Sequence, residues 1–324
     1  MSLLLFVSMN SWAQNPNANQ NKFLQLNADL PTPNVYRTAS GAPGHAYWQN
    51  TADYQMDIVL DDDKQRIYGV EKINYTNKSP DDLEYLWIQL DQNVRNPESE
   101  TYKIQQGNIK DGVSLYEYFN LFHTFPGGFN IDYVNDENGN SFSVKVNHTM
   151  MRVDLAKPLQ SGDSIAINIK WWYNINDRME MGGRSGYEYF KEEDNYLYTI
   201  AQFFPRMAVY SDVTGWQNKQ FLGRGEFTLP FGDYDVKLTV PESMVVGATG
   251  EIQNEDEVLT DLQKERLEKA KTSDKPVIII TQDEAIINEK NRSSKTKTWH
   301  FKAQNVRDYG WCASRKFIWD AQGI

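Results

Sequence analysis

The sequence predicts a mainly β fold built from antiparallel sheets. Apolar and polar residues alternate along many short stretches, which is typical of half-buried strands. Clusters of Asp, Asn, Gly and Ser separate these stretches and indicate tight turns. With 324 residues, of which 40% are hydrophobic, the chain is long enough to bury one large core or two smaller ones.

The expected strands follow from the alternation. In chain order they are residues 54–60, 67–75, 83–90, 151–155, 165–173, 196–202, 234–240, 277–281 and 297–303. Along residues 165–173, Trp171 and Tyr173 share a face with the isoleucines, whereas Trp172 faces the other way. We therefore expect Trp171 and Tyr173 in the core.

One segment has a convincing helical pattern. Residues 260–270 begin with Thr260 followed by Gln263, a capping box, and carry many charges, so we expect a surface helix. Residues 93–127 contain several aromatic residues without a regular period. We expect them to form a long excursion that packs onto the sheets.

The start of the sequence predicts export. Residues 1–13 are apolar and end in small residues at Ser11 and Ala13, as in the remnant of a signal peptide cleaved before Gln14. Residues 14–25 are rich in Asn and Gln, so we expect a flexible leader over residues 14–46, with structure beginning near Tyr47. We expect a periplasmic or extracellular protein without a membrane span, because no segment approaches the length needed.

Composition excludes some classes of partner. With 33 Lys and Arg against 44 Asp and Glu, the net charge of -11 opposes phosphate contacts, and we expect no nucleic-acid partner. The single cysteine, Cys312, cannot form an internal disulfide or a thiolate metal cluster. We expect it to be a half-buried apolar residue.

No motif in the chain predicts catalysis or metal binding. A helical zinc site of the H-E-x-x-H type is absent, and the four histidines, His45, His123, His148 and His300, are far apart. The acidic clusters at residues 61–63, 191–194 and 255–257 lack the ligand spacing of a calcium loop, so we expect solvated turns. We therefore expect no catalytic and no metal-binding residue in this chain.

Several segments nevertheless resemble one family of enzymes. Residues 54–90 resemble the opening strands of the saddle-shaped amino-terminal domain of the aminopeptidase N family. Residues 186–205, which read GYEYFKEEDNYLYTIAQFFP, are similar to the family's hairpin and amine-binding strand, and residues 208–250 keep the order of turns and strands that follows. Residues 306–314, VRDYGWCAS, resemble the junction that opens the catalytic domain.

The resemblance implies a fold and a domain order. Residues 47–303 would form an antiparallel, saddle-like β-sandwich domain, and residues 304–324 the truncated start of an α/β thermolysin-like catalytic domain. Zinc would be bound by the missing downstream domain and not by this chain. The chain would frame the peptide substrate of an exported aminopeptidase, and alone it would be inactive.

The resemblance also implies two substrate-binding positions. Gln202 matches the amide that holds the free amine of the substrate. The next such position, usually Glu or Gln in the family, is Phe204 here, a departure that puts strict selection of a free amino terminus in doubt. Two alternatives stay open: a secreted β-sandwich that binds glycans through exposed aromatic residues, and an adaptor whose downstream domain has lost zinc chemistry.

Overall fold

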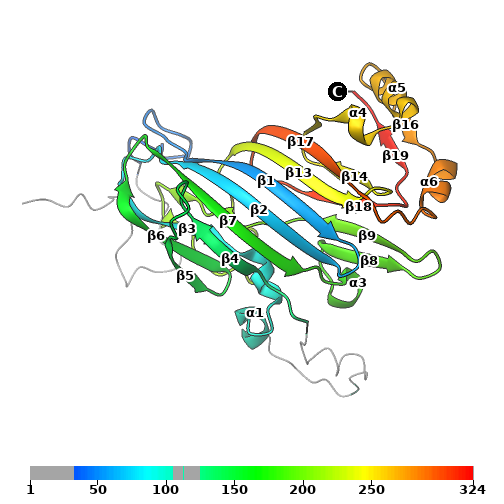
Figure 1. Ribbon diagram of the computed structural model, residues 1–324. Helices are drawn as coiled ribbons and strands as arrows, with labels where there is room; N and C mark the ends of the chain where they lie inside the picture. Colours follow the sequence, from blue (N-terminus) through cyan, green and yellow to red (C-terminus); the bar gives the residue numbers. More distant parts are fainter. Residues whose placement is uncertain (1–32, 105–111, 113–124, 324) are drawn as a thin grey trace, which may run out of the picture.

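The computed structural model describes residues 33–104, 112 and 125–323, and in that part of the chain it is mainly β (Figure 1). The strands of this part form five sheets, with 7, 4, 4, 2 and 2 strands. The predicted strands are all confirmed, most of them within a few residues. The fold class expected from the alternation is therefore correct.

The largest sheet has the order β15-β17-β13-β1-β2-β7-β4. Its strands are β1 (Thr51–Asp61), β2 (Arg66–Thr76), β4 (Asn130–Asn135), β7 (Ser164–Asn174), β13 (Gly232–Pro241), β15 (Glu251–Ile252) and β17 (Thr296–Val306). All neighbours are antiparallel except β1 and β13, which run parallel with Tyr54 opposite Tyr234. This parallel pair brings the first and second halves of the chain together at the centre of the sheet.

Two four-stranded sheets accompany the large one. The first, β10-β3-β6-β5, contains β3 (Leu83–Gln89), β5 (Ser143–Asn147), β6 (Met150–Leu159) and β10 (Arg206–Met207). The second, β14-β18-β9-β8, contains β8 (Gly186–Phe190), β9 (Asn195–Ile200), β14 (Val245–Ala248) and β18 (Trp311–Ser314). The short pairs are β11 (Tyr210–Ser211) with β12 (Gly215–Trp216), and β16 (Val277–Ile280) with β19 (Trp319–Ala321).

The helices of the described chain are short. They are the 3-10 helix η1 (Asp91–Arg95), α1 (Glu100–Ile104), α3 (Arg178–Met181), α4 (Glu255–Val258), α5 (Asp261–Ala270) and α6 (Gln282–Asn288). The predicted helix is α5, and its capping box of Thr260 and Gln263 is present. Helix α6 was not predicted, although Thr281 and Glu284 form a second capping box. Figure 1 shows α5, α6, β16 and β19 gathered at one end of the molecule.

The core combines aliphatic side chains with a set of large aromatic ones. Trp171 and Tyr173 are 1% and 2% exposed, as the alternation along β7 predicted. Trp171 packs edge-on against Phe129 and Phe203, at centroid distances of 5.4 and 6.3 Å. On the neighbouring strand, a Cβ at Gly69 would lie 2.2 Å from the ring of Trp171, so only glycine leaves room for this indole.

The expected flexible leader needs correction where the structure describes it. Residues 33–46 contain a β-bridge between Arg37 and Pro43, and Arg37 donates from Nε to Asp212 at 2.7 Å. Asp212 is only 4% exposed, so this ion pair attaches the segment to the body of the protein. The expectations for residues 1–32, and for most of the excursion at 93–127, lie outside the described residues.

The expected domain boundary between residues 303 and 304 falls inside β17. Beyond it, β18 lies between β14 and β9 and pairs with both. Residues 304–323 therefore pack into the same sheets as the residues before them, because strand pairing continues across the boundary. No helix in the described residues is long and apolar enough to cross a membrane.

Candidate substrate-binding cleft

Gln202 lies in a cleft of about 400 Å³ just beyond the end of β9. The cleft is bounded by η1, by the glycine-rich loop before β8, by the segment after β9 and by the segment before β18. Its lining is Val94, Arg95, Gly183, Arg184, Ser185, Thr199, Ala201, Gln202, Arg206, Phe221, Gly223, Glu226 and Asp308. The residues come from distant parts of the chain and meet only in the folded protein.

The backbone at Gln202 is held in an unusual conformation. Its φ is +53°, in the left-handed region that costs a non-glycine residue about 1–2 kcal/mol. The side chain of Gln92 donates to the carbonyl of Gln202 at 2.9 Å, and Ser185 Oγ donates to the carbonyl of Ala201 at 3.1 Å while accepting from its N–H. Two side chains from other elements thus fix the direction of the chain here, and the expected strand 196–202 ends at Ile200.

Phe204 lies apart from the cleft. It is 0% exposed and packs edge-on against Tyr54, with a centroid distance of 5.2 Å. It also contacts Tyr234 and Phe203. The expected substrate contact of Phe204 therefore needs correction: the ring fills the core, because two positions after Gln202 the chain points inward, and no surface is left for a ligand.

A buried ion-pair network supports the floor of the cleft. Arg206 lies 2.9 Å from Asp91 and 2.7 Å from Asp308. Arg206 and Asp91 are 5% and 2% exposed, whereas Asp308 is 42% exposed. Burial raises the pKa of Asp91, and the charge and hydrogen bonds of Arg206 oppose that rise. One cation thus faces two carboxylates, so the half-exposed Asp308 carries negative charge that Arg206 only partly offsets.

The other charged groups of the lining differ in their partners. Arg184 pairs with Glu226 at the exposed rim. Arg95 donates from Nη1 to Gln92 Oε1 at 2.9 Å, and no carboxylate of the described residues lies within ion-pair distance of it. Burial lowers the pKa of Arg95, yet an arginine side chain stays protonated in proteins.

Sequence reasoning missed most of this cleft. Arg206 carried a readable signal, since an arginine within the apolar run FFPRMAV is expected to be buried and paired. Asp308 lies in the segment 306–314 that resembles the junction, but its place in a cleft was not predicted. Asp91 and Gln92 carried no signal, because their partners are more than a hundred residues away, and Arg95 carried none because its burial depends on the fold.

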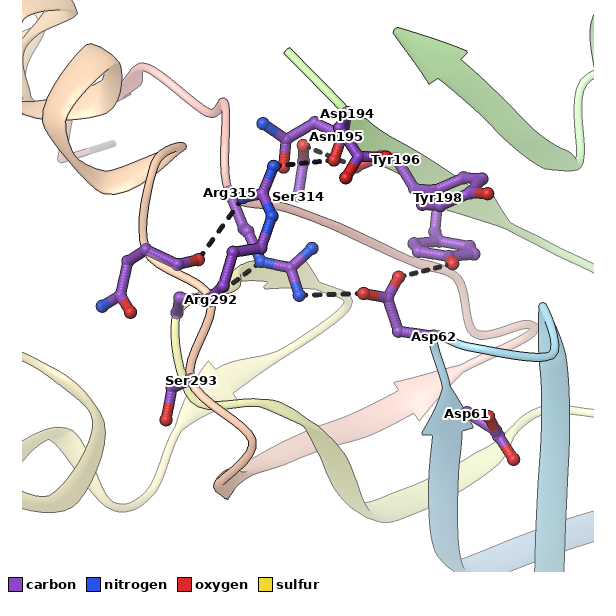
Figure 2. Close-up of polar contacts among 12 residues, drawn as sticks. Asp61, Asp62, Asp194, Asn195, Tyr196, Tyr198, Arg292, Ser293, Ser314 and Arg315 are labelled. Atoms are coloured by element: carbon purple, nitrogen blue, oxygen red, sulfur yellow. Dashed lines mark hydrogen bonds and ion pairs between the residues drawn. The ribbon is translucent and has the colours of Figure 1, made fainter. Parts of the chain in front are cut away.

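A second cleft, of about 670 Å³, lies where the β1–β2 turn meets the end of β18. Asp62 accepts a hydrogen bond from Tyr198 at 2.7 Å and from Arg315 at 2.8 Å, as Figure 2 shows. Arg315 also donates to Ser243, and Arg292 donates to the backbone carbonyls of residues 193 and 194. The expectation of a solvated turn at residues 61–63 is therefore wrong for Asp62, whose partners come from other sheets.

The histidines of the described residues form no metal site. His300 contacts Asp235 at 2.7 Å from Nε2, and neither His45 nor His148 belongs to a group of three metal-ligating side chains in the described part of the chain. Among the residues that the structure describes, no group of three His, Cys, Asp or Glu side chains is placed to hold a metal ion. His123 lies outside those residues.

The aromatic residues that would serve a glycan-binding protein are engaged by other side chains. Trp48 stacks on Tyr210 with a centroid distance of 5.8 Å, in a small cleft of about 160 Å³. Trp172, which faces away from the core as predicted, is covered by the guanidinium of Arg66 at 4.1 Å. This covering does not favour the glycan-binding alternative.

No protein-family model and no curated protein matches the sequence. Solved structures similar to the chain include an M1 zinc metallopeptidase from Deinococcus radiodurans, with 11% identity and a TM-score of 0.41, over 84% of this chain and 43% of that one. A mutant of that enzyme bound to a Tyr-Ser-Ala substrate gives 11% identity and a TM-score of 0.41, over 82% and 42%. The chain thus spans less than half the length of these structures.

Proposed function

We propose that this chain is the amino-terminal, substrate-framing part of an exported zinc-dependent aminopeptidase, and that its cleft binds the free amino terminus of a peptide. One observation carries the proposal. Gln202 lies in residues 186–205, which resemble the family's amine-binding strand, and Asp308 lies in residues 306–314, which resemble the junction with the catalytic domain. Both residues line the same cleft.

The chemistry of these two side chains suits an ammonium group. The amide oxygen of Gln202 accepts a hydrogen bond, and the carboxylate of Asp308 supplies negative charge. Arg206 does not neutralise Asp308 fully, because it also pairs with Asp91. A hydrogen bond to a charged group contributes about 1.5–3 kcal/mol, enough to distinguish a free from a blocked amino terminus.

Zinc, in this proposal, is held outside this chain, because the described residues do not fit a metal site. When bound, it would polarise the peptide carbonyl and activate water. The part of this chain is to hold and orient the amine. We also propose the family's order of a saddle domain over residues 47–303 followed by the catalytic domain, with a continuous junction, since strand pairing crosses residues 303 and 304.

The proposal is tested by binding to the chain itself. We expect alanyl-alanine amide to bind at least about tenfold more tightly than its N-acetylated form, as each 1.4 kcal/mol is a factor of ten. Gln202→Ala and Asp308→Asn should both reduce that difference, whereas Gln217→Ala, in the aromatic cleft, should leave it unchanged. Equal binding of the free and acetylated peptides by the unaltered chain, measured by NMR titration, would refute the assignment.

In an enzyme that contains the downstream domain, Gln202→Ala should lower kcat/KM by roughly ten- to a hundredfold, with little change in Tm. The family usually has Glu or Gln at the position of Phe204, so Phe204→Glu would restore a hydrogen-bond acceptor if this position faced the substrate. Because Phe204 is fully buried, we now expect Phe204→Glu to unfold the protein instead.

A further inference from the structure

Most of the charged side chains that line the Gln202 cleft form ion pairs with one another, whereas Arg95 does not. Arg206 has Asp91 and Asp308, and Arg184 has Glu226. Arg95 has no carboxylate within ion-pair distance among the described residues, and its hydrogen bond goes to the neutral amide of Gln92. A half-buried guanidinium that has no direct ion pair, and whose charge Asp91 opposes at longer range, favours an anionic ligand, since burial weakens its solvation by water.

Arg95 lies beside two glycines and near a buried tyrosine hydroxyl. A Cβ at Gly183 would lie 3.6 Å from Nη2 of Arg95, and a Cβ at Gly127 would lie 2.6 Å from its carbonyl oxygen. The buried hydroxyl of Tyr173, which has no hydrogen-bond partner in the described chain, lies within electrostatic range, since Arg95 opposes the burial that raises the pKa of Tyr173. The hydrogen bond to Gln92 and the neighbouring Gly183 thus place the guanidinium at the wall of the Gln202 cleft.

Gln92 connects Arg95 to the backbone that carries Gln202. Its Oε1 accepts from Arg95 at 2.9 Å, and its Nε2 donates to the carbonyl of Gln202 at 2.9 Å. Only one amide group and two hydrogen bonds therefore separate the guanidinium from the residue proposed to bind the amine. Arg95 and Gln202 both line the cleft, so one ligand in it can face both side chains.

We propose that Arg95 is a carboxylate-binding subsite, and that it selects peptides whose first residue is acidic. The inference rests on the proposed function, because Gln202 and Asp308 would hold the ammonium of the same residue. Arginine suits this ligand, since its planar fork of N–H donors matches the two oxygens of a carboxylate.

The test compares glutamyl-alanine amide with glutaminyl-alanine amide, which differ only in the charged group. We expect the chain to bind the glutamyl peptide about tenfold more tightly, as a charged contact of this kind predicts. Arg95→Gln should abolish the preference, and Arg95→Lys should keep part of it by retaining the charge. Arg307→Gln, which removes an exposed arginine outside the lining of the cleft, is the matched control and should leave the preference unchanged.

Other peptides separate the possible results. N-acetylglutamyl-alanine amide keeps the acidic side chain but lacks the free amine. If the chain binds it more tightly than the acetylglutaminyl peptide, and binds free and acetylated peptides almost equally, the Arg95 subsite is supported and the amine proposal is refuted. Free glutamine that binds as tightly as the glutamyl peptide would show that Arg95 takes the α-carboxylate, which would overturn the side-chain assignment. Three results would overturn the subsite. They are equal binding of glutamyl and glutaminyl peptides, a preference that persists in an Arg95→Gln variant shown to be folded by circular dichroism, and no binding of any peptide.

Discussion

The two charged clefts of this protein look alike in composition and differ in how their charges are satisfied. In the cleft at the β1–β2 turn, Asp62 and Arg315 pair with each other and are completed by Tyr198 and Ser243. In the cleft at Gln202, the pairing leaves Arg95 without a carboxylate and Asp308 only partly neutralised. Charges that satisfy one another hold sheets together, whereas charges left over are available to a ligand.

The same short stretch of chain serves both clefts. Asp308 enters the Gln202 cleft just before β18, and Arg315 reaches the β1–β2 turn just after it. One strand, β18, thus connects Asp308, which we propose as a binding group, to Arg315, which pairs with Asp62. The comparison predicts that substitutions around Arg315 change stability, whereas substitutions of the leftover charges change binding.

The largest effect is expected where the two roles meet, at Arg206. Arg206→Ala would leave the 2%-exposed carboxylate of Asp91 without its partner, and we expect a loss of about 3–5 kcal/mol in the free energy of unfolding. Urea denaturation measures it. A double variant, Arg206→Met with Asp91→Leu, should recover most of the loss, and a single variant as stable as the original protein would show that the pair is not buried as described.

Glu71 extends the comparison to a buried carboxyl group that has no hydrogen-bond partner among the described residues and lines neither of the two clefts. It is 1% exposed, and neither oxygen has a hydrogen-bond partner among the described residues. Burial raises the pKa of Glu71 well above its ordinary value, so the folded protein keeps a proton that the unfolded chain releases. Stability should therefore fall by up to about 1.4 kcal/mol per pH unit as the pH rises above the unfolded-state pKa.

The control for this pH dependence is Glu71→Met, which replaces the carboxyl with an apolar group of similar length. We expect the variant to lose that part of the slope and to be more stable than the unaltered protein at neutral pH. Chemical denaturation at several pH values, starting at about 4, near the ordinary pKa of Glu, measures both the pH slope and the stability at neutral pH. Identical slopes for the two proteins would show that Glu71 is ionised in the fold.

A somewhat smaller effect is expected at Asp62. Asp62→Ala removes the partner of Arg315, which is 6% exposed, and should cost about 1.5–3 kcal/mol. The neighbouring Asp63 is exposed, so Asp63→Ala should stay within about 0.5 kcal/mol. Neither should alter the preference for glutamyl peptides. Equal effects of the two substitutions on Tm would remove the distinction between the clefts.

The smallest expected effect has the opposite sign. Gln202→Gly relieves the left-handed conformation at φ +53°, while the backbone carbonyl still accepts from Gln92. We expect a gain of about 0.5–1 kcal/mol in stability together with the loss of discrimination for a free amine. A variant that is less stable than the unaltered protein would place a structural role on the Gln202 side chain.

The strands could be predicted because their signal is local. Alternation placed β1, β2, β7 and β13, and the capping box at Thr260 placed α5. Helix α6 has an equally clear capping box at Thr281 but is only 7 residues long, and it was not predicted, whereas the strand before it was. Local signals thus give the elements and not always their ends.

The clefts could not be predicted in the same way. Asp62 sits in an acidic turn that looked solvated, because its partner Arg315 is 253 positions away. Gln202 was found only through a family resemblance, and Phe204, two positions later, points into the core. A run of residues such as AQFFP does not show which side chain faces solvent once the strand has ended at Ile200.

The parallel pairing of β1 with β13 also bears on how the protein folds during synthesis. Tyr54 lies opposite Tyr234, so 180 residues must be made (234 minus 54) after β1 leaves the ribosome before its partner appears. At about 5–20 residues per second, this takes roughly 10–40 s. During that time one edge of β1 has no partner strand, and such an edge is prone to pair with other chains. The central strand of the finished sheet is therefore the point at which a nascent chain most needs the protection of a chaperone.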